Sequence, residues 1–537
     1  MTRRTGFLWQ SALAVGLVII AAGSLASLLH EPDESAVARM FELTYLDTGS
    51  DFDLEPATPS TQEDEIHGIL VDCLDADHPF DDKLEELQLV IWMLPDKSSS
   101  VLPAPAEVPN LSSNEYAIAS AFEMLCREEA ADRFQSAGQL YASDAGIRLR
   151  TLAAEPVEYA GFALSLVLRD LDPEAAGQAL LREIEGFNNE AMRDRLIRLY
   201  LDNRQYDEIE ALKRDPRFAS GIDPSVEQNI ALSRMDWSTL VRTLIPAAYE
   251  DVNPAMVFLA LVAGAIWAVI LLRFNGAISF RAAPVRLALP ALLLGALSAH
   301  ATILFIFWQE HQLGLGMGSD VMGQFVYSLG IGFREEGLKL LFFCPLLPFL
   351  WRRSDLEILT VAGLVGLGFA IEENINYFAG SAGLSALGRF ATANFMHISL
   401  TALGGLTLAR ACIHRRARDL QQAGITFASI VAFHGLYDAF LIVDLLADSA
   451  WLSMTVFIVM SYQYFGWLRH LRDEWKDPVS ITSVFTLGLV VVTGLSYCLY
   501  AWEFGMADAF NGVVSEVLGI AVILIMFYRE IPETIHS

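Results

Sequence analysis

The sequence has 537 residues, of which 53% are hydrophobic, and its mean hydropathy is +0.39. This composition is too apolar for a soluble protein, yet 19% charged residues are too many for a chain embedded in a membrane throughout. We therefore expect two regions of different character. The formal net charge of −29 comes mainly from acidic residues between positions 31 and 251, which argues against nucleic-acid binding because that requires a basic surface.

The N-terminus carries Arg3 and Arg4, followed by an apolar run from Phe7 to Leu29. The run is about as long as a membrane span of ~20 residues. Small residues at 22–26 could mark a signal-peptide cleavage site, but more apolar residues follow them. We therefore favour an uncleaved anchor at residues 1–29, and the positive-inside rule places the N-terminus in the cytoplasm.

Two segments with different sequence patterns follow the anchor. Residues 30–65 are rich in Asp, Glu, Pro, Ser and Thr, which predicts an acidic flexible tether. Residues 66–253 have helical apolar spacing and predict an extracytoplasmic α-helical domain, for which a solenoid is one architecture although no clean repeat is present. Its clearest helical segments are Glu115–Cys126, Ala130–Ser143, Pro173–Phe187 and Glu190–Leu201. Cys73 and Cys126 could form a disulfide in an oxidising compartment.

The rest of the chain is a series of apolar runs separated by short loops. The runs are approximately Ala255–Leu272, Leu287–Trp308, Val321–Leu350, Ile358–Phe378, Phe390–Ile413, Ile425–Leu446, Trp451–Leu468, Val484–Trp502 and Ala509–Tyr528. With the anchor they predict an all-α, polytopic α-helical membrane protein of about ten spans. Basic loops alternate with loops poor in Lys and Arg, Arg389 being the exception, which places both termini in the cytoplasm and residues 30–253 outside.

We divide this region into two transmembrane helices at 254–320, a membrane core at 321–446, and three C-terminal helices with a cytoplasmic tail at 447–537. The core begins with a run that carries Glu335, Glu336 and Lys339 close to its midpoint. Each charge at the centre of a span costs about 2.5 to 3.5 kcal/mol on insertion scales. Lys339 could neutralise one carboxylate on the same helix face, which leaves the other uncompensated and favours a functional site.

The next three spans also carry polar side chains between the membrane midplane and its outer third. They are Glu372, Glu373 and Asn374, then His397, then His434 with Asp438. Singly, each has a structural explanation: His397 could bond a neighbouring helix, and Asp438, at i+4 from His434, could orient that ring. We interpret His300, which is isolated in its span, as structural. Convergence of four spans at one depth instead predicts a catalytic site.

The residue types in this set suit hydrolysis of an amide by a Glu-activated water. Clustered carboxylates in a low dielectric cannot all ionise, so at least one should hold a proton near neutral pH and act as a general acid or base. A neighbouring histidine or asparagine can donate to a developing oxyanion. The spans contain no serine nucleophile elbow, no paired aspartates of the presenilin type and no His-Glu-x-x-His motif, which argues against other intramembrane hydrolase mechanisms.

These segments resemble, in order and spacing, the PrsW family of intramembrane proteases, which is related to the CAAX prenyl protease and bacteriocin-processing superfamily. The matching residues are Glu335-Glu336-Gly337-Leu338-Lys339, Phe369-Ala370-Ile371-Glu372-Glu373-Asn374, His397 after Arg389, and His434-Gly435-Leu436-Tyr437-Asp438. They span about residues 324–440, roughly a fifth of the chain. Lys339 follows Glu336 by three places, as in the PrsW branch, whereas the wider superfamily has an arginine four places on. This difference argues against a prenylated substrate.

The resemblance implies a peptidase of the bacterial cytoplasmic (inner) membrane that cleaves membrane-anchored proteins, as bacterial PrsW cleaves an anti-sigma factor at its extracytoplasmic side in stress signalling. By motif, Glu335 and Glu336 would hold the catalytic water, and His434 would stabilise the oxyanion. Glu373 or Asn374 and His397 would complete the shell of the water. Supporting roles would fall to Lys339, Glu372, Asn374, Asp438 and Arg389.

The sequence leaves open whether the site binds a metal cofactor. If one is present, zinc suits the ligand types, and its ligands would come from Glu335, Glu336, Glu373, His397 and His434, although no close spacing on one helix requires a metal.

Two other function classes are compatible with intramembrane carboxylates and histidines. An ion-coupled transporter uses them as proton relays, but the sequence has no inverted repeat and no matching pair of broken helices. A non-catalytic receptor would bind a ligand through its outer domain, but buried charges without a function would be a standing cost. The partners that we expect are a membrane-anchored protein substrate and the lipid bilayer.

Overall fold

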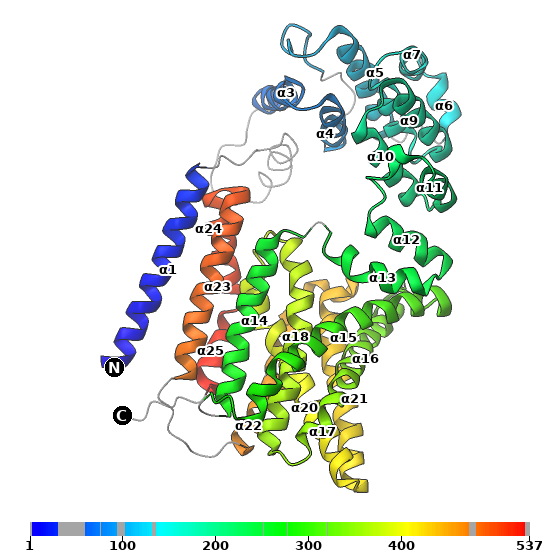
Figure 1. The fold of residues 1–537 in the computed structure, drawn as a ribbon. Coiled ribbons are helices and arrows are strands. Elements are labelled where there is room, and N and C mark those ends of the chain that lie inside the picture. Colours follow the sequence, from blue (N-terminus) through cyan, green and yellow to red (C-terminus); the bar gives the residue numbers. More distant parts are fainter. Residues whose placement is uncertain are drawn as a thin grey trace. The chain divides into compact units, whose positions relative to one another are not determined.

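The computed structural model describes residues 3–29, 59–75, 77–93, 102–130, 136–250, 252–275, 278–318, 320–449, 451–471 and 480–531. Within these ranges every regular element is a helix (Figure 1), which confirms the all-α class. The chain separates into two compact units. We call Asp33–Thr243 the acidic unit, and Met1–Pro32 with Leu244–Ser537 the membrane unit.

The acidic unit is a series of short helices. They are α3 (Pro59–Asp75), α4 (Phe80–Met93), α5 (Ser113–Ala130), α6 (Ala137–Ala142), α7 (Asp144–Ala154), α8 (Ala160–Leu168), α9 (Pro173–Phe187), α10 (Glu190–Asp202), α11 (Tyr206–Leu212), the 3-10 turn η2 (Pro216–Phe218) and α12 (Pro224–Arg234), and α13 (Trp237–Ala248) continues into the membrane unit. Helices α5, α9 and α10 confirm three predicted segments. The fourth, Ala130–Ser143, lies partly outside the described residues and contains α6.

Helix starts in this unit follow from local capping chemistry. Asp172 accepts a hydrogen bond from the Ala175 amide at the start of α9, with Pro173 in the first turn. At the start of α12, Asp223 accepts from the Val226 amide, and a proline again follows the cap. An Asp cap before Pro satisfies an amide that the helix itself leaves unpaired. Helix α3 begins at Pro59, so residues 59–65 of the expected tether are helical, whereas residues 30–58 lie outside the described residues.

The helices of the acidic unit pack largely in chain order, with α7 against α8, α8 against α9, α9 against α10 and α10 against α11. Packing between neighbours is a property of solenoids, and the solenoid stays a prediction. Cys73 and Cys126 are both buried free thiols, so the disulfide considered from the sequence is not formed in this structure.

Burial of Glu129 near the end of α5 predicts a pH dependence of stability in the acidic unit. Burial, reinforced by the charge of Asp170, raises the pKa of Glu129 from its usual 4.5 to about 7. The folded state therefore binds this proton more tightly, so its stabilisation is complete below pH 4.5 and is lost as the pH rises through about 7. Gln resembles the protonated acid, so Glu129→Gln should be more stable than wild type at pH 8.5, by roughly 1 kcal/mol because the side chain is part-exposed, and equal at pH 4.

Thermal unfolding of the acidic unit at the two pH values, monitored by its susceptibility to proteolysis, measures this difference in stability. The adjacent Glu128→Gln is the matched control. An advantage of Glu129→Gln that is the same at both pH values would contradict the prediction.

The membrane unit contains the long helices. They are α1 (Arg3–Leu29), α14 (Pro254–Phe274), α15 (Ala283–Leu313), α16 (Val321–Phe343), η3 (Cys344–Leu346), α17 (Leu347–Leu350), α18 (Asp355–Ala379), α19 (Ala386–Ala391), α20 (Ala393–His414), α21 (Ala417–Ile442), η4 (Asp444–Ser449), α22 (Trp451–Leu471), α23 (Ile481–Phe504), α24 (Met506–Gly519) and α25 (Ala521–Glu530). Among the described residues, six helices are long and apolar enough to cross a membrane, or seven if the bent pair α24 and α25 is one span.

The structure thus confirms a polytopic membrane protein, whereas the count of ten spans stays a prediction. Three of the ten predicted spans correspond to α1, α16 and α22, which belong neither to the six nor to the bent pair. The predicted run Val321–Leu350 is not one helix, because α16 ends at Phe343 and Pro345 follows. Proline removes a helical hydrogen bond and clashes with the preceding turn. The run Ala509–Tyr528 is bent by 52° between α24 and α25.

Helix α18 lies at the centre of the membrane unit, packed against α14, α15 and α20 (Figure 1). Of the six span candidates, α18 is the most buried, with 83% of its most apolar window inside the protein. Trp267 of α14 anchors the aromatic core and donates from Nε1 to the Phe390 carbonyl at 2.8 Å. The side chains on α18 are therefore held by contacts on several sides, which suits a helix that positions a site.

Candidate active site

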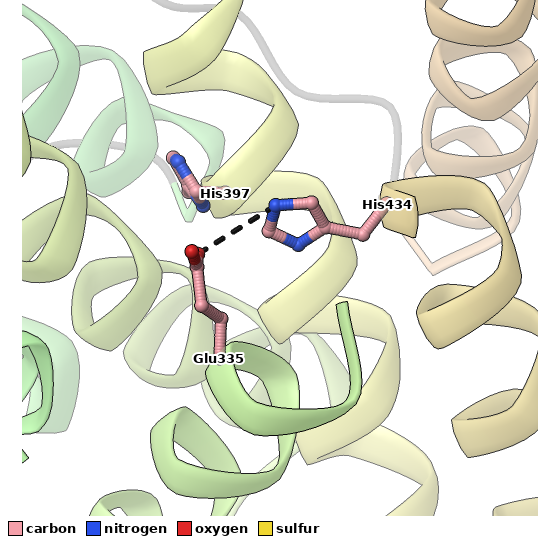
Figure 2. A group of neighbouring side chains, drawn as sticks. All are labelled: Glu335, His397 and His434. Carbon is pink, nitrogen blue, oxygen red and sulfur yellow. Dashed lines mark ion pairs between the residues drawn. The ribbon is translucent and has the colours of Figure 1, made fainter. Parts of the chain in front are cut away.

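Three side chains from different helices converge in the membrane unit. Glu335 on α16, His397 on α20 and His434 on α21 point toward one another (Figure 2), and one potential ligand atom from each lies within 4.8 Å of the others. The sequence separations, from 37 to 99 residues, show that only tertiary packing could bring them together.

Two glycines explain how the helices come close enough. A Cβ at Gly332 of α16 would lie 2.5 Å from the Val431 carbonyl oxygen of α21, and a Cβ at Gly366 of α18 would lie 2.2 Å from the His397 carbonyl oxygen of α20. Both distances are shorter than van der Waals contact, so only glycine permits these crossings. Small residues at crossings let membrane helices approach closely, and here they bring the backbones of both histidine-bearing helices against their neighbours.

Lys339 is the central cation of the site. It is fully buried, and its Nζ lies 2.8 Å from Glu336 Oε1 and 3.2 Å from Glu335 Oε2. It also lies 3.8 Å from the centre of the Phe369 ring. The sequence predicted that Lys339 could pair with one carboxylate, whereas in the structure its ammonium contacts both glutamates.

His434 is oriented by the fully buried Glu336. Its Nδ1 lies 2.9 Å from Glu336 Oε1, while its Nε2 lies 3.6 Å from Glu335 Oε2 and 3.5 Å from Asp438 Oδ2. Because Lys339 already donates to Glu336, this carboxylate is an acceptor and Nδ1 of His434 is the donor. A neutral His434 therefore presents the lone pair of Nε2 toward Glu335 and Asp438, as a base or a metal ligand would.

His397 has contacts on both ring nitrogens. Its Nδ1 lies 2.7 Å from Lys339 Nζ and its Nε2 lies 2.9 Å from Glu373 Oε2. An ammonium can only donate, so Nδ1 accepts and Nε2 donates to Glu373. Arg389, which broke the charge pattern of the loops, donates to Glu373 at 2.7 Å and to Asn374 at 2.5 Å. The expected supporting residues Arg389 and Asn374 are thus held beside Glu373.

Glu372 is not brought into this cluster. Its Oε1 lies 3.0 Å from Nε2 of His300 on α15 and 2.5 Å from the hydroxyl of Tyr249. Adjacent residues on a helix point about 100° apart, so Glu372 faces α15 while Glu373 faces α20. His300, which we expected to be isolated, therefore has a carboxylate partner.

The structure adds residues that sequence reasoning missed. Thr401 Oγ1 lies 3.4 Å from Glu336 Oε2, and Asn394 accepts from Asn374 at 2.7 Å while its own Nδ2 has no partner among the described residues. Both lie on α20 at four and three residues from His397, so helical spacing from that histidine is the signal that could have found them.

The site holds more negative than positive fixed charge. Four carboxylates, those of Glu335, Glu336, Glu373 and Asp438, face two permanent cations, Lys339 and Arg389. Unbalanced charge is costly within a membrane protein. One divalent cation, or two protons held by these carboxylates and the His434 imidazole, would balance the two remaining negative charges.

The donor set fits zinc by type, since two imidazoles and one carboxylate occur together in catalytic zinc sites. Tetrahedral ligands with bonds of about 2.1 Å lie about 3.4 Å apart, whereas these three donors lie within 4.8 Å of one another. Binding would therefore draw the donors together, and His397 would have to give up its contact with Lys339 or Glu373. Glu336 and Glu373, also considered as ligands, are engaged by Lys339, Arg389 and the two histidines.

The fold and the site define an integral membrane protein with a carboxylate and imidazole cluster, suited to hydrolysis, on its membrane helices. Residues 283–464 match the family model described as PrsW family intramembrane metalloprotease, and this part of the chain belongs to that family. No curated protein and no solved structure matches the chain. The family makes the protein a protease, and so a hydrolase, in preference to the transporter and receptor alternatives. The match extends beyond the motif region at 324–440 to take in α15.

Proposed function

We propose that this protein is an intramembrane endopeptidase that hydrolyses membrane-anchored proteins in the outer half of the bilayer. The observation that carries the proposal is the convergence of Glu335, His397 and His434 within 4.8 Å. We place the enzyme in a bacterial cytoplasmic membrane, with both termini cytoplasmic and residues 30–253 outside. By its resemblance to PrsW, an anti-sigma factor with a single span is the first substrate class to test.

We assign zinc as the metal, with Glu335, His397 and His434 as its ligands. Bound there, zinc would polarise the scissile carbonyl and make a water nucleophilic near neutral pH. The excess of two carboxylates over permanent cations supports a divalent ion. The alternative without a metal needs two protons within the cluster. One of them would lie on Nε2 of His434, which would then donate to the oxyanion.

The remaining residues divide into a proton acceptor and a positioning network. Glu336 is fully buried and bonded to both Lys339 and His434, so we assign it to orienting His434 rather than to holding water. Asp438 Oδ2 has no hydrogen-bond partner among the described residues, and the side chain is 17% exposed. We assign Asp438 to take a proton from the attacking water and return it to the amine as the carbon–nitrogen bond breaks.

The test of this proposal is cleavage of a single-span anti-sigma factor in proteoliposomes, with zinc content measured on the same preparation. Wild type should hold about one zinc per chain, lose cleavage when 1,10-phenanthroline removes the metal, and recover it when zinc returns. A preparation free of metal that still cleaves at the original rate would exclude the zinc assignment and favour a protonated His434. Wild type that cuts no single-span protein under any metal condition would contradict the proposed substrate class.

A further inference from the structure

Tyr249, His300 and Glu372 form a second polar cluster outside the active site. Only Glu372 adjoins an active-site residue, Glu373, in the sequence. Both the Tyr249 hydroxyl and His300 Nε2 contact the same oxygen of Glu372, at 2.5 Å and 3.0 Å. His300 is 7% exposed and its Nδ1 has no partner among the described residues. A neutral His300 therefore donates from Nε2, and one carboxylate oxygen accepts from two donors.

The position of the cluster follows from a close helix crossing. A Cβ at Gly295 of α15 would lie 2.0 Å from the Val365 carbonyl oxygen of α18, and a Cβ at Gly368 of α18 would lie 2.1 Å from the Leu292 carbonyl oxygen of α15. His300 and Glu372 follow these glycines by five and four residues, about one helical turn. The glycines bring the two backbones together, and the polar pair joins them one turn further along.

Tyr249 links this crossing to another part of the chain. It lies between α13, the helix that continues from the acidic unit, and α14, which begins at Pro254. Its hydroxyl bond therefore ties the segment between α13 and α14 to α18. The residue after Glu372 is Glu373, which holds His397 and Arg389 in the active site. A shift of α18 at Glu372 would move both carboxylates, since they share one rigid helix.

We infer that Tyr249, His300 and Glu372 are positioning residues that hold α18 so that Glu373 orients His397. The inference rests on the proposed proteolytic function of the active site. The cluster acts through α18 and touches no reacting atom.

The experiment compares Tyr249→Phe, which removes one hydroxyl, with wild type in full-length protein in proteoliposomes containing the same anti-sigma substrate. We expect kcat to fall about tenfold while KM stays within about twofold, because positioning acts on the transition state more than on binding. Glu372→Ala, which removes the contacts with both Tyr249 and His300, should lose at least as much. The double variant should lose little more than Glu372→Ala alone, because that substitution already removes the bond of the Tyr249 hydroxyl. Tyr528→Phe, which removes a hydroxyl bonded to Thr486 at 3.0 Å, is the matched control.

Hydrogen exchange provides a readout that does not depend on proteolysis. Amides of residues 369–379 on α18 should exchange faster in Tyr249→Phe than in wild type or Tyr528→Phe. Unchanged exchange together with kcat within about twofold of wild type would overturn the inference. So would a lower unfolding temperature with unchanged kcat per folded molecule, which would mean a structural bond only. If wild type and Glu335→Gln are equally inactive, the proposed function fails, and exchange alone decides whether the cluster holds α18.

Discussion

Glu335→Gln should abolish zinc binding and lower kcat on the order of 10³-fold or more while leaving the protein folded. Glu335 is the carboxylate among the three converging donors, and Gln offers a neutral oxygen that is a far weaker ligand. The side chain is 12% exposed, and Lys339 has a separate, shorter contact with Glu336 at 2.8 Å, so neutralisation of Glu335 leaves the Glu336–Lys339 pair intact. Zinc content, kcat and unfolding temperature of one preparation give the three results.

Two variants separate the roles in this prediction. Glu503→Gln makes the same chemical change at an exposed position at the end of α23 and should match wild type in all three measurements. Asp438→Asn should keep zinc but lose activity, because it removes the proposed proton acceptor without removing a ligand. Retention of zinc in Glu335→Gln, or full activity in Asp438→Asn, would show that these assignments are wrong.

Lys339→Met should destabilise the protein by about 3 to 5 kcal/mol and abolish activity. Methionine has a similar volume and no charge, so the loss would come from electrostatics and not from a cavity. Lys339 is fully buried, and its removal leaves Glu336, also fully buried, with no permanent cation beside it. His397 would lose its Nδ1 donor at the same time. Thermal unfolding in detergent, with the same substrate assay, measures both effects.

A compensating variant makes this prediction specific to charge. Lys339→Met combined with Glu336→Gln removes both members of the buried pair, so stability should return toward wild type while activity stays lost. The control is Lys213→Met in the acidic unit, where a 28% exposed Lys213 lies 3.4 Å from Glu210, and where we expect a change of less than about 1 kcal/mol. A double variant as unstable as the single one would show that Lys339 acts through packing instead.

Local sequence patterns were sufficient for the helices and for the residue types of the site. The helical spacing of the acidic unit predicted α9 and α10 nearly to the residue, because helix periodicity is a property of a short segment. Where a run contained Pro345, the apolar pattern alone overestimated the helix, since it ignores the missing amide of proline.

The sequence by itself was sufficient to predict that charged and imidazole side chains of four apolar runs share one membrane depth, because depth is predicted by counting residues along apolar helices. It could not determine which side chains meet. Glu372 and Glu373 are neighbours of identical chemistry, yet one pairs with His300 and the other with His397. That difference depends on how α18 is rotated between α15 and α20, and close crossings at Gly366 and Gly368 set the rotation. Only the tertiary structure decides it, because the contacts come from helices remote in the chain.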